Sequence, residues 1–584
     1  MLYDPSLNAF FNALIREWDL ARYHRRGQDE ASSASSQPDV FEIRGPDDTA
    51  LVIPCQFRTQ TGRHCLTGPL QLNRHGQTEN ISFEQAVEWC LTLDALQREA
   101  SPQALEALKA RVIASKQNLD AAQQARTGAL EHLFRESLSF IEAEQALISG
   151  HSIHPCPKDR GNMTLEQAQR YAPEYGDYFP LIWYSVAEAH LFNREAEGVT
   201  ADQGIKALLD TEPAADDLRA ATPSSHRLMP CHPFQHYHWQ RTPALRSLQA
   251  SGALRCIGPG ASHWRATSSL RAIYCEAAPW MLKFSLSVWL TNSIRHLQPE
   301  EVVRGAELCR VLNSGPVRQW LTSRPNFEVL REPVATGIQG SDGQPLPETL
   351  VTWRENPLQG TNAANTEMLA TLLQDDPRNG ESRLSQRLHA AQMTPDQTQQ
   401  WFLRYLNVAV APLLEAQSLF GILFGAHQQN LVLQLHGIWP QRLFFRDCQG
   451  TGFTSLATHR LGDELSHLAN DSANLLPDDL GIRLFCYYLF INATFNVIAS
   501  LAAGGLVHEA DLIQTLRDWL SARLDEQPPD DRAIRYLLES HSLYAKGNFL
   551  CTLRALNETT LDDVFSIYHP FTNPLHRESH CHVA

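Results

Sequence analysis

The segment 425–450 constrains the fold of this chain more than any other stretch. It reads GAHQQNLVLQLHGIWPQRLFFRDCQG, with two apolar runs separated by a short turn that contains Gly and Pro. Apolar runs of this length around a turn predict a β-hairpin. His427 and Asn430 precede the first predicted strand, and Arg446 and Asp447 follow the second. The hairpin therefore brings these polar side chains together at its open end.

Asn430 and Asp447, held side by side, suit a complex of Mg²⁺ with a nucleotide. Mg²⁺ prefers a few oxygen ligands together with substrate phosphates. The alternative is a hairpin with a buried His427 and a surface Asp447, and the segment alone leaves both open. The sequence contains neither GxxxxGK[ST] nor GxGxxG, which disfavours P-loop and Rossmann nucleotide binding.

The bulk composition limits the class of protein. A chain of 584 residues is too long for one hydrophobic core, and two to four domains are expected. Its 43% hydrophobic and 20% charged residues are ordinary for a globular protein. The net charge of −16 argues against nucleic-acid binding. An anionic substrate must therefore be bound by a local cluster of Lys and Arg.

The expected location is the cytoplasm. The first 18 residues have apolar positions at helical spacing and lack the basic and apolar regions of a signal peptide. No uninterrupted apolar run reaches the ~18–20 residues that a membrane span needs, so we predict no membrane partner. The 12 Cys include no CxxC pair, which favours reduced thiols over a disulfide framework.

The pattern along the chain predicts an α+β fold with several domains. A Ser-rich loop at 26–39 precedes short apolar runs to about residue 75, which indicate a small sheet. Apolar residues then recur at helical spacing over 83–149, and Gly150 is the expected C-cap. The predicted domains are 1–149, 150–350 and 351–584.

Within the third predicted domain, 349–354 is expected to be a strand, and 482–502 and 509–524 are expected to be helices.

The segment GHSIHPCPKDR at 150–160 places several possible anion-binding groups in one loop. It carries His151, His154, Lys158 and Arg160, and its prolines prevent a regular helix. A rigid loop of this kind aims several donors at one anion. Two alternatives stay open: a zinc site built on the two His and Cys156, or a purely structural loop.

The segment MLKFSLSVWLTNSIR at 281–295 alternates apolar and polar residues, which predicts a strand with one polar face. Lys283 lies on that face among small hydroxyl residues rather than carboxylates. Together with Arg295, Ser269 and Arg271 it can form a pocket for phosphates and a polycarboxylate. An ordinary solvated strand face is the alternative. The His-rich segment 230–238 suits a packed turn or a site equally, and His580 and His582 are expected in a frayed tail.

Five motifs, in the same order along the chain, resemble the NRPS-independent siderophore synthetases of the IucA/IucC family. They are GHSIHPCPKDR with YAPEY, MPCHPFQ, SSLRAIY with LKFSLSVWLTNSIR, AHQQN with RDCQG, and KGNF before Asn573-Pro574. The resemblance covers about residue 140 to the end and is weaker before. It is greatest to the branch that uses free citrate, and within it to the aerobactin type.

This resemblance implies a cupped-hand fold, with thumb (1–149), fingers (150–350) and palm (351–584), a kinase-like hairpin site in the palm, and the active site between fingers and palm. It implies that ATP adenylates a citrate carboxylate, that pyrophosphate leaves, and that an amine attacks. N6-acetyl-N6-hydroxylysine is the first choice of amine; a diamine, ethanolamine or serine stays open. A kinase-like phosphotransferase is the other alternative. A homodimer is implied as well.

The resemblance also assigns roles residue by residue, with ATP and Mg²⁺ as cofactors. The residues predicted to be catalytic are Lys283, Arg295 and His427. Those predicted to bind ATP are Ser269, Arg271, Lys283, Arg295, Gln429, Asn430 and Asp447. Those predicted to bind citrate are His154, Arg271, Thr291, Arg295 and His427, with His151, Lys158 and Arg160 as further candidates. Asp447 and Asn430 are the predicted metal ligands.

Three positions depart from the family pattern. Gly425 stands where a Glu is usual, Ala272 where a Thr is usual, and Asn162-Met163 where Gly-Phe is usual. Mg²⁺ must then rely on Asp447, phosphate oxygens and water. The cationic set is complete, so a working enzyme is predicted. A kinase is disfavoured because no Asp occupies the base position of an HxDxxxxN loop.

Overall fold

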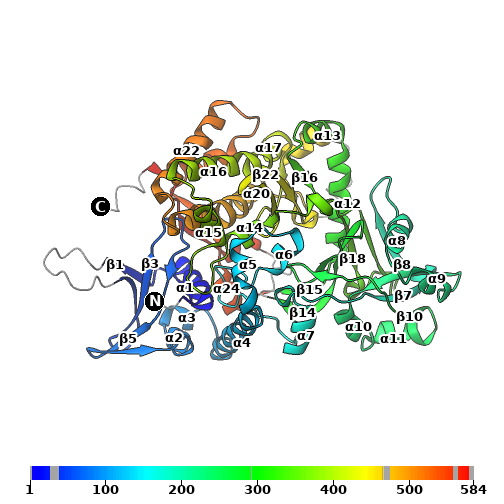
Figure 1. Cartoon of the computed structure of the whole chain (residues 1–584), viewed down its shortest axis with the longest axis horizontal. Coiled ribbons are helices and arrows are strands. Elements are labelled where there is room, and N and C mark those ends of the chain that lie inside the picture. The colour runs from blue at the N-terminus through cyan, green and yellow to red at the C-terminus, as the bar shows by residue number, and fades with distance from the viewer. Residues whose placement is uncertain are drawn as a thin grey trace.

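A computed structural model describes residues 3–25, 38–290, 293–462, 465, 474–556 and 563–577. Thr291, most of the Ser-rich loop, and the His580 and His582 tail lie outside the described residues. Figure 1 shows the N-terminal region, in blue, at one end of the molecule. Strands β7, β8 and β10 lie at the other end, and the helices of the C-terminal region lie above both.

The N-terminal region is one helix against an antiparallel sheet, followed by helices, as the sequence predicts. Helix α1 (Pro5–Glu17) is N-capped by Asp4, whose carboxylate accepts hydrogen bonds from the amides of Ser6 and Leu7. The sheet order is β1-β2-β3-β5-β6, and β4 pairs with β3. These strands are Ala21–His24, Asp39–Arg44, Thr49–Phe57, Leu70–Arg74, Gln77–Ile81 and, for β4, Cys65–Leu66.

The helices that follow are α2 (Phe83–Cys90), α3 (Asp94–Gln97), α4 (Pro102–Arg126), α5 (Leu130–Arg135) and α6 (Phe140–Gln145). The prediction that Gly150 is a helix C-cap was wrong, because α6 ends at Gln145 and Ala146 is its C-cap. Gly150 is needed for another reason. Its φ is +75°, and a Cβ there would lie 2.6 Å from the Pro157 carbonyl oxygen.

The middle region contains two sheets of three or more strands, besides the two-stranded sheet of β14 (Leu286–Leu290) and β15 (Ser293–Arg295). The larger has the order β11-β12-β13-β18-β17-β8, and the smaller has the order β10-β7-β9. The strands of the larger sheet are Arg265–Ala266, Ala272–Tyr274, Trp280–Phe284, Val351–Glu355, Val334–Ile338 and Leu191–Glu195, in that order. Those of the smaller sheet are Leu254–Pro259, Ile182–Ala187 and His226–Cys231. The predicted strand at 349–354 is therefore confirmed as β18.

The predicted strand at 281–295 is broken into three pieces. These are β13, β14 (Leu286–Leu290) and β15 (Ser293–Arg295), and the last two form a separate hairpin. The break lies at Ser285, whose buried hydroxyl donates to the Pro347 carbonyl at 2.6 Å and accepts from the Leu297 amide at 2.8 Å. Lys283 and Arg295 consequently lie in different sheets.

The predicted hairpin is confirmed as β21 (Leu431–His436) and β22 (Trp439–Phe445), with Gly437 at φ +60° in the turn. It lies in a sheet of order β16-β22-β21-β19, whose outer strands are Phe327–Val329 and Thr366–Met368. Because β16 comes from before residue 350 and β18 from after it, these sheets exchange strands across the predicted domain boundary. The division into three domains stays a prediction.

Helices make up most of the described chain after residue 390, and α16 (Pro395–Tyr405) packs directly on strand β22 of the hairpin. These helices include α16, α17 (Ala411–Phe420), α20 (Asp478–Cys486), α21 (Phe495–Ala503) and α22 (Glu509–Asp525), which confirm the helices predicted near 482–502 and 509–524. A π-helix, η9 (Tyr487–Thr494), joins α20 to α21. The continuous helix 478–503 is long and apolar enough to cross a membrane, but 89% of its apolar stretch is buried within the protein. It is packed as a core helix.

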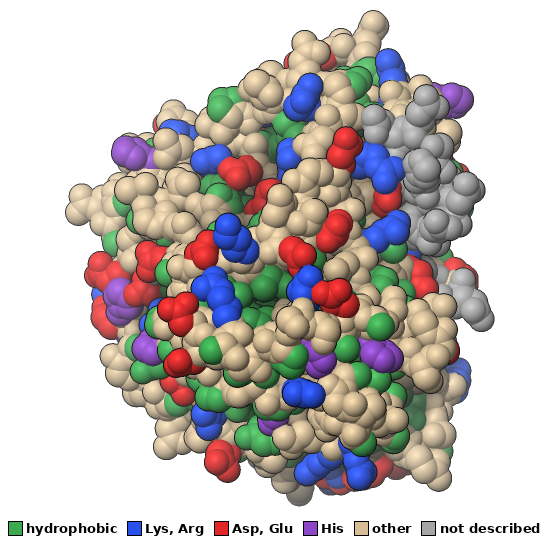
Figure 2. All heavy atoms as spheres, turned by 90° about the vertical axis from the view of Figure 1, so that its right-hand side faces the viewer, with side chains coloured by type: hydrophobic (Ala, Val, Ile, Leu, Met, Phe, Trp, Pro, Cys, Tyr) green, Lys and Arg blue, Asp and Glu red, His purple; other side chains and the backbone are tan. Residues whose placement is uncertain are grey.

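The surface carries charges of both signs. Figure 2 shows acidic and basic side chains interspersed over the face that contains α8 (Ala201–Leu209) and α9 (Ala215–Ala220). The local cluster of Lys and Arg that the sequence predicts for an anionic substrate lies elsewhere, in a cavity between the middle sheets and the hairpin.

Candidate functional site

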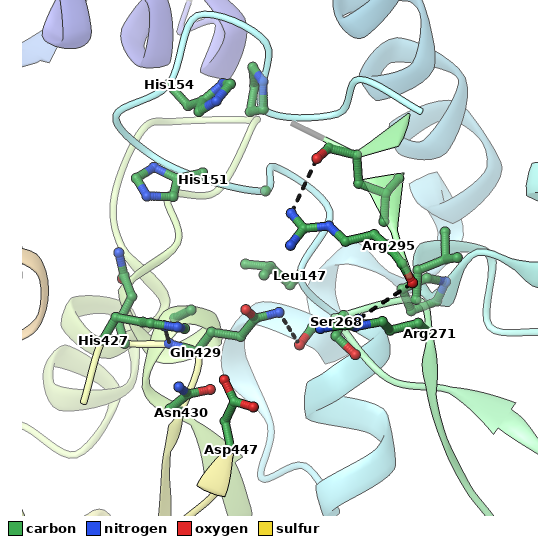
Figure 3. A pocket seen from close by; sticks show the side chains of 18 of the residues that line it. Leu147, His151, His154, Ser268, Arg271, Arg295, His427, Gln429, Asn430 and Asp447 are labelled. Carbon is green, nitrogen blue, oxygen red and sulfur yellow. Dashed lines mark hydrogen bonds between the residues drawn. The ribbon is translucent and has the colours of Figure 1, made fainter. Parts of the chain in front are cut away.

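A cavity of about 370 Å³ collects the predicted site residues. Figure 3 shows Arg271 and Arg295 on one side of it, His427, Gln429, Asn430 and Asp447 on another, and His151 and His154 across from Asp447. The predicted residues that line it are His151, His154, Lys158, Arg160, Ser269, Arg271, Lys283, Arg295, His427, Gln429, Asn430 and Asp447. Thr291 is the one predicted site residue outside the described part of the chain.

Lys283 and Asp447 form the central ion pair of the cavity. The Lys283 ammonium donates to Asp447 Oδ1 at 2.5 Å and to Gln449 Oε1 at 2.7 Å, and the Lys283 side chain is only 6% exposed. Burial alone would raise the pKa of the Asp447 carboxyl, but the charge and hydrogen bond of Lys283, with Arg354 and Arg271, hold that pKa well below its usual range. Asp447 is therefore a carboxylate at every working pH.

Two residues beside the cavity that are not glycine have positive φ angles. Asp447 has φ +80° and follows the last strand of the hairpin. Leu270 has φ +65° between Ser269 and Arg271. A bulky residue such as Leu rarely adopts this conformation, and strained positions cluster at functional sites. At both places the reversed backbone turns polar side chains toward the cavity.

Arg271 and Arg295 approach the cavity from the same side. Arg271 Nη1 donates to the Arg295 carbonyl at 3.4 Å, and Arg295 Nη2 donates to the Leu290 carbonyl at 3.2 Å. Ser269 Oγ accepts from the Ala272 amide at 3.1 Å, which fixes the turn that carries Arg271. Both guanidinium groups are therefore positioned at the edge of the cavity by hydrogen bonds to backbone carbonyls.

The 150–160 loop forms the far wall of the cavity. The Nδ1 atoms of His151 and His154 accept from the amides of Ile153 and Cys156 at 3.1 and 2.9 Å, which fixes both rings. Arg160 pairs with Glu174, and Lys158 lies 3.5 Å from the same carboxylate. Burial, and then the charge of Arg160, lower the pKa of Lys158 well below its usual value.

The zinc alternative is not supported by this loop. Cys156 is fully buried in the apolar cluster of the N-terminal region, and burial raises the pKa of its thiol. Among the described residues no group of three or more His, Cys, Asp and Glu side chains is placed to hold a metal ion.

His427 is held as a neutral ring. Burial lowers its pKa to about 4, against the opposing charge of Asp447 and with help from Arg446, Lys546 and Arg295. Its Nδ1 accepts from the Gln429 amide at 3.3 Å, so Nε2 carries the proton at neutral pH. His427 can therefore donate a hydrogen bond to a carboxylate, and it is not an acid catalyst near pH 7.

His427→Gln is expected to flatten the acid side of the stability profile. A His whose pKa is lowered on folding contributes stability above about pH 6.5, and this contribution is lost as the pH falls toward 4, with a slope of at most about 1.4 kcal/mol per pH unit. Melting temperatures of the wild type and H427Q between pH 4 and 7 measure this. Parallel curves for the two proteins would contradict a neutral His427 with a lowered pKa.

The residues at the hairpin end fit a Mg²⁺ ion that is also bound by phosphates. Asn430 Nδ2 donates to the Gly425 carbonyl at 2.8 Å, which leaves its amide oxygen on the side away from that carbonyl. Figure 3 shows Asn430 beside Asp447. One carboxylate and one amide oxygen, with phosphate oxygens and water, make a suitable ligand set.

The backbone around residue 425 explains why this position holds Gly and not the Glu that the resemblance predicts. A Cβ at this position would lie 2.8 Å from the Gly450 carbonyl oxygen, so the 446–450 segment closes over the space that a Glu side chain would need.

The assignment of site residues from the sequence missed many residues that also line the cavity, and six of them carry polar or charged groups from segments to which it gave no role. They are Arg354, Tyr487, Tyr488, Asn492, Lys546 and Asn548. The KGNF motif was a signal for the last two, although no role followed from it. Tyr487, Tyr488 and Asn492 belong to η9, and π-helical turns inside α-helices occur frequently at functional sites. No periodicity in the sequence marks that turn.

Comparison with known proteins gives full-length matches. Residues 139–374 match a family model described as the IucA / IucC family, and residues 399–561 match one described as a ferric iron reductase FhuF-like transporter. The N(2)-citryl-N(6)-acetyl-N(6)-hydroxylysine synthase of Vibrio mimicus is 35% identical over 99% of this chain and 97% of its own length. The Escherichia coli protein of that name is 31% identical, with 98% and 97% coverage.

A solved structure also matches the whole chain. The ATP-bound aerobactin synthetase IucA from Klebsiella pneumoniae superimposes with a TM-score of 0.89 at 29% identity, covering 98% of this chain and 100% of that one.

Proposed function

The chain belongs to the IucA/IucC family of siderophore synthetases, and from this premise we propose that it joins citrate to an amine in an ATP-dependent reaction. ATP adenylates one citrate carboxylate, pyrophosphate leaves, and the amine attacks the citryl-adenylate to give an amide. N6-acetyl-N6-hydroxylysine is the proposed amine, because two relatives matched over their full length are named for this product. We also propose that the enzyme acts in the cytoplasm and forms a homodimer.

One observation supports this proposal most strongly: several Lys and Arg side chains face the same cavity as the end of the hairpin that carries Asp447. Adenylation requires citrate, an anion, to approach a triphosphate, and fixed positive groups must offset this repulsion. Lys283, Arg271 and Arg295 face the cavity that Asn430 and Asp447 also line. We assign the first three to the phosphates and to citrate. Mg²⁺, held by Asp447 and Asn430, would supply further positive charge at the phosphates.

The opposite end of the cavity suits citrate and the amine. His154, His427 and Arg295 are donors around one space, and His151 lies next to His154 with ring centroids 6.0 Å apart. Several fixed donors are needed to present one carboxylate of citrate rather than another.

A kinase-like phosphotransferase is the second candidate, because a hairpin with Asn and Asp occurs in that class. The cavity argues against it. Its described carboxylates are Asp159, Glu174 and Asp447, and each is ion-paired, with Arg111, Arg160 and Lys283 respectively. Among these residues none is an unpaired base for an attacking hydroxyl.

Product analysis tests the proposed reaction. Purified protein with ATP, Mg²⁺, citrate and a panel of amines should form AMP and pyrophosphate only when citrate is present, and the product mass should identify the amine used. Formation of ADP, or nucleotide turnover that does not depend on citrate, would refute the adenylation of citrate.

A further inference from the structure

The N-terminal region has no role in the site as described so far. Residues 1–138 lie outside both family-model matches, and none of them lines the cavity among the described residues. Yet α1 packs against α24 (Asn548–Leu553), which lies more than 500 residues later in the chain. Figure 1 shows α24 beside α1 and near α4.

One side chain joins these two helices. Glu17, the last residue of α1, accepts a hydrogen bond from the Phe549 amide at 2.7 Å through Oε1 and from the Leu550 amide at 2.8 Å through Oε2. These amides belong to the first turn of α24, where backbone N–H groups have no partner within the helix. A Cβ at the preceding residue, Gly547, would lie 3.0 Å from Glu17 Oε2, so the absence of a side chain there makes room for this close approach.

Aromatic packing fixes the same junction. The Phe549 ring contacts Phe10 and Trp18 of the N-terminal region edge to face, with centroid distances of 5.1 and 5.3 Å. Phe549 is fully buried in the apolar cluster of that region. The start of α24 is therefore anchored in the N-terminal region by both a bidentate carboxylate and a buried ring.

The anchored turn carries cavity residues. Lys546 and Asn548, directly before Phe549, both line the cavity. Asn548 Nδ2 donates to the Ile153 carbonyl at 2.8 Å, and Ile153 lies between His151 and His154. The contacts thus run from Glu17 to the start of α24, and from Asn548 to the loop that carries both His side chains.

We propose that Glu17 is a positioning residue for the reaction, which holds the 546–548 segment and the 151–154 loop as one wall of the cavity. This inference rests on the proposed function, since that wall is the one assigned to citrate and the amine. Glu17 itself touches no substrate. Its effect is expected at that end of the cavity and not at the phosphate end, which is built on Lys283 and Asp447.

Three variants separate this role from general stability. Glu17→Ala removes both acceptors, whereas Glu17→Gln keeps the shape and one acceptor oxygen. Burial raises the pKa of the Glu17 carboxyl to about 8, against the amides of Phe549 and Leu550 and the charge of Arg16. Gln therefore preserves the neutral state near pH 7, but its NH2 group replaces one of the two oxygens that accept from these amides. Glu99→Ala is the matched control, because Glu99 pairs with Arg554 at the other end of α24.

Steady-state kinetics and hydrogen exchange form the test. E17A is expected to raise the KM for citrate and for the amine about tenfold, the size of one or two lost hydrogen bonds, with the KM for ATP changed less than about twofold. E17Q, which keeps one of the two acceptors, should recover part of this loss, and E99A should match the wild type. The Phe549 and Leu550 amides should exchange faster in E17A only. If E17A does not fold, Glu17→Asp, whose side chain is one methylene shorter, should also raise the KM for citrate and for the amine more than the KM for ATP.

Equal increases in all three KM values, or unchanged exchange at Phe549 and Leu550 in E17A, would overturn the positioning role. A wild-type protein without citrate-dependent pyrophosphate release would instead overturn the proposed function. The exchange experiment would still decide whether Glu17 holds the start of α24.

Discussion

Replacing Lys283 by Met is expected to lower the rate of citrate-dependent pyrophosphate release by about 10²–10³-fold. Lys283 is a buried cation between Asp447 and Gln449, at distances of 2.5 and 2.7 Å. A fixed donor aimed at charge that develops in the transition state contributes about this much in a cavity that excludes water. Single-turnover pyrophosphate release with saturating ATP and citrate measures the step directly.

A double-mutant cycle tests whether Lys283 and Asp447 act as one unit. Asp447→Asn alone is expected to lose activity to a similar extent, and the double variant should lose little more than either single variant. Lys206→Met, the same change on an exposed helix, is the control and should keep wild-type rates. Losses that multiply in the double variant would show that the two residues contribute independently.

The sequence predicts the site best where its parts are local. The hairpin, with His427 and Asn430 before it and Asp447 after it, follows from one segment of 26 residues, because a two-residue turn fixes the pairing of its strands. Lys283 was identified by its small polar neighbours on an alternating segment. The segment that carries Lys283 and the hairpin end that carries Asn430 and Asp447 were therefore each predictable from the sequence by themselves.

What joins those pieces depends on tertiary contacts that leave no local pattern. Lys283 and Asp447 are 164 positions apart, and nothing in either segment encodes their 2.5 Å contact. Ser285 ends β13 because its hydroxyl bonds to two distant backbone groups, although the alternation around it continues. Gly425 appears in the sequence only as a missing ligand, whereas the structure shows that Gly450 has taken its space. Tertiary packing determines all three features, and the periodicity of the sequence carries no information about it.

Glu144→Ala is expected to destabilise the protein more than any other single change argued here, by about 3–5 kcal/mol. Glu144 is fully buried on α6, where its carboxylate pairs with Arg446 at 2.8 Å and accepts from the Ser268 amide at 2.9 Å. The variant would leave the Arg446 guanidinium, itself 4% exposed, without its carboxylate partner. Removing one partner of a buried ion pair leaves an uncompensated charge in a medium that solvates it poorly.

An exposed pair on the neighbouring helix supplies the control. Glu131 on α5 pairs with Arg135 and Arg378 at the surface, so Glu131→Ala should cost no more than about 1 kcal/mol. Urea unfolding of E144A, E144Q and E131A, followed by tryptophan fluorescence, gives the comparison. E144Q should lie between the others, because it keeps an acceptor for Ser268 and loses only the charge.

A urea midpoint of unfolding for E144A that is no lower than that for E131A would contradict the stabilisation assigned to the Glu144 contacts.

The loss of Glu144 also has a consequence for catalysis, because Glu144 bonds directly to both sides of the cavity. Ser268 precedes the turn that carries Arg271, and Arg446 precedes Asp447 at the end of the hairpin. E144A molecules that remain folded should therefore also release pyrophosphate more slowly, since the cations and the Asp447 carboxylate would no longer share one fixed support.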